Sequence, residues 1–135
     1  MLASGSEDET IKIWDVKTGK LLFSKSNGDC WSAVESVSLS PDGKLLASGG
    51  DKTVKIWNIA TEELLFSFND HIEKVVSVSF SPDSRLLASC SRDGTVKLWV
   101  RLNNLWVNQP SFSVIKPKSL VQTELYFERS CSSLA

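Results

Sequence analysis

Hydrophobic and small polar residues alternate along several short stretches of the 135-residue chain. In one stretch Val76, Val78 and Phe80 are separated by serines, and a similar alternation begins at Val34. A period of two places successive side chains on opposite faces of a β-strand. The pattern therefore predicts that the chain is built from short β-strands.

Turn-forming residues separate the predicted strands. Ser40-Pro41-Asp42-Gly43 follows one alternating stretch and Ser81-Pro82-Asp83-Ser84 follows the next. Proline presets the backbone angle of the second turn position, and aspartate and glycine suit the positions after it. Both segments are predicted to be hairpin turns that lead into a second strand, over residues 44–49 and 85–91. Because Ser84 replaces the glycine, a left-handed backbone is expected to cost slightly more at that position.

A third strand carries a tryptophan and occurs three times, as Thr10–Trp14, Thr53–Trp57 and Thr95–Trp99. Each copy follows a run of small residues and a tight turn. In the first two units a loop and an apolar fourth strand come next, over residues 20–24 and 63–68. Four short strands in about 42 residues are typical of one blade of a β-propeller.

These units resemble the WD-repeat β-propeller family. The resemblance runs from Leu2 to about Trp99, and its name-giving dipeptide is Trp14-Asp15, which becomes Trp57-Asn58 and Trp99-Val100 in the later copies. It implies an all-β fold: a partial β-propeller of about three four-stranded antiparallel blades with an irregular C-terminal tail. The arc would cover residues 1–100, as a partial blade over 1–26, a blade over 27–69 and a blade without a regular fourth strand over 70–100, and the tail would cover 101–135.

In this family a buried chain of polar side chains ties each blade together. A tryptophan donates to a serine, the serine meets a histidine from the preceding loop, and the histidine meets an aspartate in the tight turn. A completed chain pairs its buried polar groups and fixes one packing arrangement. The resemblance assigns these roles to His71, Ser89, Asp93 and Trp99 in the third copy, to Ser48, Asp51 and Trp57 in the second, and to Ser4, Asp8 and Trp14 in the first.

The second copy departs from this pattern at two places. Cys30 stands at the histidine position, so Asp51 is expected to lose that partner. In addition, one residue fewer separates Ser48 from Asp51 than separates the corresponding residues of the other copies. We therefore expect the tight turn of this copy to be shortened or distorted.

The repeats are incomplete at both ends. Leu2 already belongs to a second strand, so the first blade is expected to lack its opening strand. After Trp99 no further repeat follows, and only residues 104–107 or 112–115 could supply a fourth strand to the third blade. Trp106 is a candidate to cap the open end of that blade. Three explanations stay open: a fragment of a longer propeller protein, two copies that complete a ring, or a monomer sealed by its own tail.

Composition adds few constraints. The chain is 41% hydrophobic and 23% charged with a net charge of −1, so no electrostatic drive favours nucleic acid or an anionic membrane. No apolar stretch reaches the ~18 residues of a membrane span, and no secretory signal is visible. Cys30, Cys90 and Cys131 form no CxxC pair, which favours reduced thiols, with Cys90 in the core. An intracellular, cytoplasmic protein is expected, with the nucleus left open, and neither a cofactor nor a metal is implied.

Two further functions are disfavoured by residue position. His71, Ser89 and Asp93 offer the residue types of a hydrolase triad, but the resemblance places them inside a blade, whereas a nucleophile must be accessible. Neither a GxSxG motif nor a phosphate-binding loop is present, so the chain is not expected to be an enzyme. Nucleic-acid binding is disfavoured as well. Lys12, Lys55 and Lys97 occupy matching positions in the third strand of each blade, which suggests that they share an outward face rather than form a binding site.

The resemblance implies a non-catalytic scaffold for protein–protein interaction, which presents the loops at one rim of its blades to a peptide or protein partner. The alternative is a regulatory or targeting part of a larger multidomain enzyme, inactive alone. Arg92 and Lys74 lie in the same blade and would suit an acidic peptide, and open blade edges would also permit self-association. By position, the rim residues are Trp31, Ala33, Ile72, Lys74, Glu7, Gly50 and Arg92.

Overall fold

The structure is a computed structural model that describes residues 1–26, 33–103, 105–109 and 112–113. These residues form β-strands joined by turns and loops. None of them belongs to a helix, so the described part of the chain has no helix that could cross a membrane. The strands are β1 (Leu2–Gly5), β2 (Thr10–Trp14), β3 (Leu21–Ser26), β4 (Ser36–Leu39), β5 (Leu45–Gly49), β6 (Val54–Asn58), β7 (Leu64–Phe68), β8 (Val75–Phe80), β9 (Leu86–Ser91), β10 (Thr95–Leu102), β11 (Leu105–Asn108) and β12 (Phe112–Ser113).

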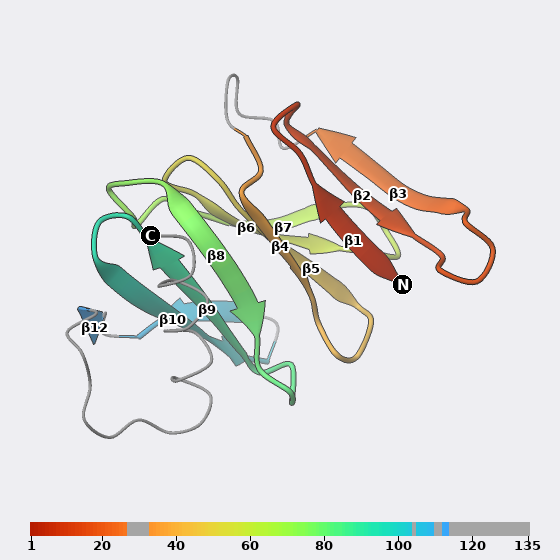
Figure 1. Cartoon of the computed structure of the whole chain (residues 1–135). Helices are drawn as coiled ribbons and strands as arrows, with labels where there is room; N and C mark the ends of the chain where they lie inside the picture. Colours follow the sequence, from red (N-terminus) through yellow and green to blue (C-terminus); the bar gives the residue numbers. More distant parts are fainter. Residues whose placement is uncertain (27–32, 104, 110–111, 114–135) are drawn as a thin grey trace.

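The strands form three antiparallel sheets, one for each copy of the repeat (Figure 1). The first sheet contains β1 to β3, the second β4 to β7, and the third β8 to β11 with β12 beside β10. Within each sheet the main strands follow one another in sequence order, because each hairpin turn returns the chain beside the strand it has just formed. This arrangement confirms the all-β fold and the partial propeller. The three sheets are called blades 1, 2 and 3 below.

Blade 3 has a fourth strand in the structure. β10 continues beyond Trp99 to Leu102, and β11 pairs with it so that Leu102 faces Leu105 and Trp99 faces Asn108. The hairpin turns at Asn103, which adopts a φ of 56°, a left-handed conformation that asparagine tolerates better than most residues. The sheet thus extends past residue 100. Its fourth strand, β11, nearly coincides with residues 104–107, one of the two segments that the sequence suggested for a fourth strand.

Hydrophobic side chains fill the two spaces between neighbouring blades. The tryptophans of the second and third copies face the preceding blade: Trp57 is 6% exposed and packs against blade 1, and Trp99 is 1% exposed and packs against blade 2. Apolar contact of this kind is the main stabilising force between the sheets. The core between blades 1 and 2 includes Ile11, Ile13, Phe23, Leu46 and Trp57, and that between blades 2 and 3 includes Leu45, Ile56, Val78, Phe80, Leu87 and Trp99.

Three side chains differ from what the sequence suggested, two in their location and one in its bonding. Trp106 is 7% exposed and packs against Phe80, so it belongs to the core between blades 2 and 3 and does not cap the open face of blade 3. Lys55 is 5% exposed, because its strand is enclosed between neighbouring blades, and the three repeat lysines therefore share no outward face. Cys90 is in the core as predicted, but it is disulfide-bonded rather than a reduced thiol.

Candidate interaction rim

Four side chains of blade 3 form a continuous buried polar chain. The indole of Trp99 donates to the hydroxyl of Ser89 at 3.2 Å, and that hydroxyl lies 2.7 Å from Nε2 of His71. Nδ1 of His71 lies 3.0 Å from a carboxylate oxygen of Asp93. The structure thus brings together the four residues that the resemblance assigned to this blade.

The electrostatics of this chain favour one arrangement of protons. Burial lowers the pKa of His71 below its usual 6.5, although the hydrogen bond and charge of Asp93 act in the opposite direction. Burial alone would raise the pKa of Asp93, but hydrogen bonds from Thr95, His71 and the backbone outweigh it and lower this pKa to about 2. A neutral His71 therefore donates from Nδ1 to an ionised Asp93 and accepts at Nε2 from the hydroxyl of Ser89.

The other two blades keep the tryptophan–serine bond in different surroundings. Trp57 donates to Ser48 at 3.1 Å inside the core, and Trp14 donates to Ser4 at 3.2 Å on an exposed face. In blade 1 the hydroxyl of Thr10 also bonds to Asp8, at 2.6 Å. Cys30, which stands at the histidine position of the second copy, lies outside the described residues.

The tight turn of blade 2 is one residue shorter than the other two, as the sequence predicted. Residues 50–53 lie between the paired residues at its ends, compared with residues 6–10 in blade 1 and 91–95 in blade 3. Thr53 is the second residue after Asp51, as Thr95 is after Asp93. Its Oγ1 is nevertheless the one buried side-chain nitrogen or oxygen atom of the described residues that lacks a hydrogen-bond partner. The equivalent hydroxyl of Thr95 donates to Asp93 at 2.5 Å.

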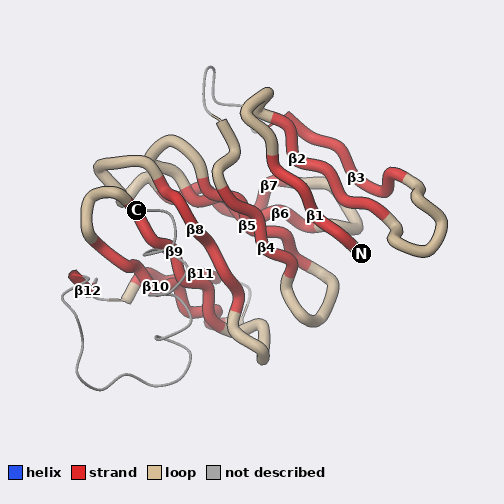
Figure 2. Tube along the Cα trace, in the orientation of Figure 1, coloured by secondary structure: helices blue, strands red, loops and turns tan. Residues whose placement is uncertain are grey.

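These tight turns and the loops between blades form one rim, which comprises residues 6–10, 33–35, 50–53, 69–74 and 91–95. Backbone hydrogen bonds join its parts: Val34 donates to Ser6 at 3.0 Å, Val75 to Gly50 at 2.8 Å, and Arg92 to Lys74 at 2.9 Å. Lys74 also forms an ion pair with Glu35 across blades 2 and 3, at 2.7 Å. The rim lies at the opposite end of the strands from the proline-containing turns (Figure 2).

Five of the seven rim residues expected from the sequence are at least partly exposed. Ile72 is 75% exposed, and Glu7 and Arg92 are exposed as well. Lys74 and Ala33 are partly exposed, while Trp31 lies outside the described residues. Gly50 is buried, which corrects its place among the rim candidates. Its carbonyl accepts a hydrogen bond from the backbone of blade 3, so this glycine connects two blades and cannot meet a partner.

Sequence reasoning missed two features of the rim. Glu35 was not singled out, although it is the ion-pair partner of Lys74. The backbone N–H of Ile72 donates to Asp93 at 3.2 Å, so the buried polar chain also holds the exposed isoleucine in place. The sequence contains one signal for the contact between Ile72 and Asp93. Ile72 directly follows His71, and a residue next to the histidine must lie close to the aspartate that the histidine contacts.

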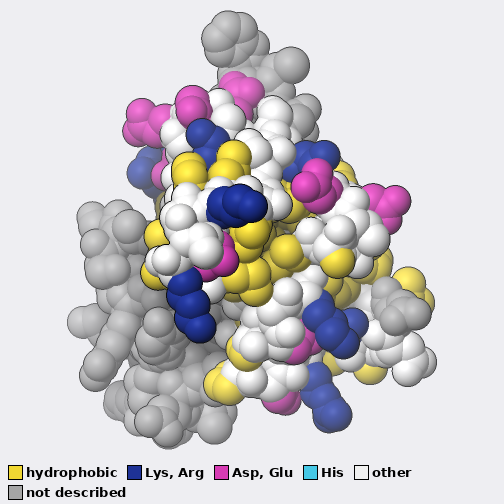
Figure 3. Space-filling model, turned by 90° about the vertical axis from the view of Figure 1, so that its right-hand side faces the viewer, with side chains coloured by type: hydrophobic (Ala, Val, Ile, Leu, Met, Phe, Trp, Pro, Cys, Tyr) yellow, Lys and Arg dark blue, Asp and Glu magenta, His cyan; other side chains and the backbone are white. Residues whose placement is uncertain are grey.

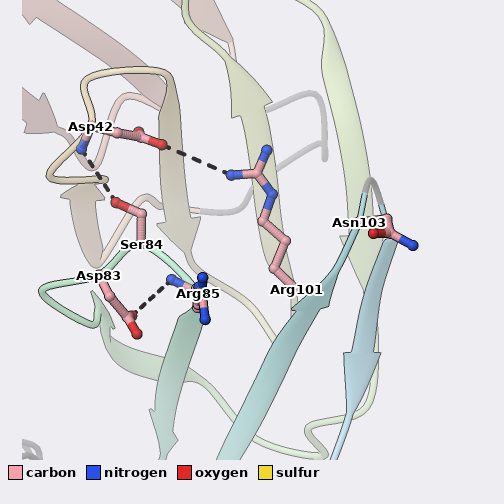
Figure 4. A pocket seen from close by; sticks show the side chains of 6 residues that line it. All are labelled: Asp42, Asp83, Ser84, Arg85, Arg101 and Asn103. Atoms are coloured by element: carbon pink, nitrogen blue, oxygen red, sulfur yellow. Dashed lines mark hydrogen bonds and ion pairs between the residues drawn. The ribbon is translucent and has the colours of Figure 1, made fainter.

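A polar hollow lies at the other end of the blades, between the two proline-containing turns. It encloses about 400 Å³ and is lined by Asp42, Asp83, Ser84, Arg85, Arg101 and Asn103 (Figure 4). Ser84 adopts a φ of 60° and accepts a hydrogen bond from the backbone of Asp42 at 3.2 Å, which links blades 2 and 3. Arg101 lies 3.9 Å from Asp42. The hollow carries two bases and two acids, so it offers no net charge to a ligand.

The residues that resemble a hydrolase triad lie inside blade 3, around the buried hydroxyl of Ser89. Ser89 is fully buried, whereas a serine nucleophile must reach its substrate. Within the described ranges, no group of three or more histidine, cysteine, aspartate or glutamate side chains could hold a metal ion. The polar chain around His71 therefore acts within the blade, and the rim above it is the candidate site for interaction.

Comparison with known proteins agrees with this architecture. The family described as WD domain, G-beta repeat matches residues 1–15, 19–58 and 62–100. The U3 small nucleolar RNA-associated protein 15 homolog of Xenopus tropicalis is 40% identical over 104 residues, which cover 76% of this chain and 20% of that protein. A Lissencephaly-1 homolog of Heterostelium pallidum is 47% identical over 49 residues, which cover 36% of this chain and 11% of that protein.

A solved structure has the same fold. The structure of U3-55K superimposes with a TM-score of 0.71 and 29% identity, over 84% of this chain and 36% of that chain. The chain thus spans a fifth or less of the two curated relatives named above and about a third of the solved chain. Repeats of this kind generally mediate protein–protein interaction. Since the matched repeats cover more than half of the sequence, and each matched segment contains one of the three repeat tryptophans, the chain belongs to the WD-repeat family.

Proposed function

We propose that this chain is a non-catalytic scaffold that presents its rim to a peptide or protein partner. Ile72 carries the proposal, because it is a large apolar side chain at 75% exposure whose backbone is fixed by Asp93. An apolar group that is already held in place loses little conformational freedom when a partner covers it. Such a residue is suited to anchor a partner at the rim.

Charged side chains beside Ile72 favour a partner with acidic residues. Arg92 is exposed, and its backbone is tied to that of Lys74, the second residue after Ile72. Lys74 already neutralises Glu35, so Arg92 is the cation more readily available to a partner. We expect the partner segment to place an apolar side chain on Ile72 and a carboxylate near Arg92, where a charge-assisted hydrogen bond can form.

The non-catalytic character rests on the burial of Ser89 and on the family itself, whose repeats generally serve protein–protein interaction. The alternative is a regulatory or targeting part of a larger enzyme. No observation on the described residues favours that alternative over a scaffold.

Site-specific photo-crosslinking tests the proposal on the full 135-residue chain. A photoreactive amino acid is placed at position 72 or, as a control, at position 16, and cell extract supplies the partners. Val16 is 68% exposed in the turn after β2, away from the rim, so the two positions match in exposure but not in location. A purified partner captured from position 72 is then titrated against the wild-type chain, Ile72→Ser and Val16→Ser.

We expect Ile72→Ser to weaken binding at least about tenfold, because a hot-spot residue typically contributes about 2 kcal/mol or more and a tenfold change corresponds to about 1.4 kcal/mol. Val16→Ser should leave the affinity unchanged. Arg92→Glu should weaken binding further through repulsion of the acidic segment. Equal capture from positions 72 and 16, or a partner whose affinity is insensitive to Ile72→Ser, would show that the rim is not the binding surface.

A further inference from the structure

A second hollow, called the inter-blade pocket below, lies among β5, β6 and β7 of blade 2 and β10 and β11 of blade 3. It encloses about 310 Å³, near the lower end of the ~300–1,000 Å³ range of ligand pockets. β6 and β10 both begin at the rim and reach the pocket at Asn58 and Arg101, near their far ends. The pocket is therefore separate from the rim.

The pocket has an apolar wall. Leu45 and Trp106 belong to the core between blades 2 and 3 and are 4% and 7% exposed. Phe66 is partly buried against the same core, and Leu65 is 40% exposed. An apolar group that enters the pocket would thus be removed from water by side chains that are already fixed by packing.

The polar part of the lining consists of Lys44, Asn58 and Arg101, so it carries two bases and no acid. On the face shown in Figure 3, by contrast, Lys and Arg side chains lie among Asp and Glu side chains. Lys44 is exposed and forms no ion pair within the described ranges. Arg101 lies 3.9 Å from Asp42 (Figure 4), and so long a pair between partly exposed side chains is weak. The pocket therefore presents positive charge to a ligand.

Asn58 changes the charge of the pocket without changing the turn that contains it. In blade 1, Oδ1 of Asp15 accepts hydrogen bonds from the backbone N–H groups two and three residues later, at 2.8 and 3.4 Å. Oδ1 of Asn58 accepts the same two bonds in blade 2, at 2.9 and 3.1 Å. The remaining polar atom is an oxygen in Asp15 but an amide nitrogen with two N–H donors in Asn58. No described residue accepts a hydrogen bond from this amide, so it can donate to an anion.

Arg101 takes the place that an apolar residue holds in the preceding blade. Ile59 and Arg101 each stand two residues after a repeat tryptophan. Their backbone N–H groups make equivalent bonds, to Lys44 at 3.0 Å and to Arg85 at 2.9 Å respectively. Ile59 packs against the core between blades 1 and 2, whereas Arg101 brings a guanidinium group with five N–H donors to the pocket. The changes at Asn58 and Arg101 both make the place between blades 2 and 3 more positive.

Trp106 supplies a further donor. The three repeat tryptophans each donate to a serine hydroxyl, but the indole N–H of Trp106 has no hydrogen-bond partner in the described part of the chain. This nitrogen is not sealed from solvent, since Thr53 Oγ1 is the one fully covered side-chain atom without a partner there. An unpaired donor on a largely buried residue of the pocket wall favours a ligand that brings an acceptor.

We propose that the inter-blade pocket is a second binding site, which takes an apolar side chain that stands next to a carboxylate in a partner protein or peptide. The apolar group would pack against Phe66 and Trp106. The carboxylate would accept hydrogen bonds from Asn58 and Arg101, with Lys44 nearby. Charge-assisted hydrogen bonds hold such an acid more strongly than neutral bonds do, and the apolar contact distinguishes it from a bare anion.

NMR titration of the full chain with two small probes tests the proposal. The first probe is N-acetylphenylalanine, whose carboxylate is that of a chain terminus. The second is the N-acetylated, C-amidated dipeptide of phenylalanine and aspartate, whose carboxylate belongs to a side chain. Each has a neutral control of nearly the same shape, N-acetylphenylalaninamide for the first and the dipeptide with asparagine for the second. The side-chain amide signal of Asn58 and the indole signal of Trp106 report binding.

Three variants sharpen the test. Asn58→Asp should keep the turn, since Asp15 forms the same bonds in blade 1, but it replaces a donor by a carboxylate. Asn69→Asp is the matched control, because it makes the same change at an exposed residue of the rim. Arg101→Ile copies the residue of blade 2 and removes the guanidinium group. Thermal unfolding of each variant verifies that it is folded before it is titrated.

We expect saturable shifts of both signals with at least one acidic probe at millimolar concentration. Affinity should fall at least about tenfold for the neutral control and for Asn58→Asp, because a hydrogen bond to a charged group is lost in each case. Arg101→Ile should weaken binding as well, and Asn69→Asp should leave it unchanged. A response to the first probe alone identifies a chain terminus as the source of the carboxylate, and a response to the second alone identifies an acidic side chain.

Four results would overturn the proposal. They are the absence of saturable shifts with either acidic probe, equal affinity for the acidic and neutral probes, shifts confined to the rim signals of Ile72 and Arg92, and equal loss of affinity in Asn58→Asp and Asn69→Asp. Because the probes contact no rim residue in the proposed site, these results leave the scaffold function at the rim to its own test.

Discussion

The ring of Phe68 stacks on that of Trp99, with centroids 4.0 Å apart and an interplanar angle of 17°. Phe68 lies on the fourth strand of blade 2, and Trp99 lies on the third strand of blade 3. One blade earlier, Phe23 meets Trp57 edge-on, with centroids 6.3 Å apart. An aromatic residue on the outer strand of one blade therefore covers the repeat tryptophan of the next.

Replacing Phe68 by alanine should lower the free energy of unfolding by about 2–3 kcal/mol, because the change removes the stacked pair and leaves a cavity over Trp99. Leu64→Ala on the same strand is the control, since Leu64 is 45% exposed, and its cost should stay below about 1 kcal/mol. Urea denaturation followed by tryptophan fluorescence measures both values. Equal losses for the two variants would contradict the role given to the stack.

Ser89→Ala should destabilise the fold by about 2–3 kcal/mol. The hydroxyl of Ser89 bonds to both Trp99 and His71 in a buried place, and its removal leaves two polar groups without that partner. Ser4→Ala provides the comparison, because Ser4 accepts the same indole bond from Trp14 on an exposed face, where water can replace it at a cost of about 0.5 kcal/mol or less. Similar losses at the two positions, measured by urea denaturation, would mean that burial does not decide the outcome.

Thr53→Val should leave the stability unchanged or raise it by up to about 1 kcal/mol. Thr53 Oγ1 is buried without a partner, and an apolar group of the same shape removes the penalty of burying it. Thr95→Val should cost about 1–2 kcal/mol, because Thr95 bonds to Asp93. Thermal unfolding of the two isosteric variants checks the difference, and a destabilised Thr53→Val variant would argue against the unpaired hydroxyl.

Acid should destabilise the fold in two ranges of pH. The pKa of Asp93 is about 2 in the folded chain, against 3.8 ordinarily, so the unfolded chain binds this proton more readily. Asp93 therefore stabilises the fold above about pH 4, and this contribution of roughly 2 kcal/mol is lost as the pH falls towards 2. The lowered pKa of His71 acts in the same direction below pH 6.5.

Urea denaturation of the wild-type chain and of Asp93→Asn, at pH values from 7 to 2, separates these contributions. The variant should be less stable at pH 7 and should lose less stability between pH 4 and 2 than the wild type. A wild-type stability that increases on acidification, or the same slope for both chains between pH 4 and 2, would contradict the inferred protonation of Asp93.

Much of the fold could be predicted because the repeat specifies where each strand and each turn lies along the sequence. Alternation at Val76, Val78 and Phe80 and the proline-containing turns depend on local chemistry, which the sequence contains directly. The shorter turn before Thr53 was predicted as well, since a missing residue between paired strands must shorten their connection. By contrast, the direction of Trp106 depends on its register against β10, which no local pattern specifies.

The candidate site was predictable to a smaller extent. The repeat places Ile72 and Arg92 on connections between strands, where exposure is the usual outcome. It does not reveal that Gly50 is covered by blade 3, because that burial depends on how two blades meet. Nor does the repeat reveal that Lys55, on the third strand of the middle blade, is buried.

Blade 2 is the only one of the three described sheets that buries both of its faces against neighbouring sheets. In such a row of units, stability is approximately the sum of each unit and its contacts with adjacent ones. The backbone amides of β5 and β6 should therefore exchange with solvent more slowly than those of β1 and β2. The chain would unravel from its ends towards its centre, and the middle repeat would serve as the last cooperative element to melt.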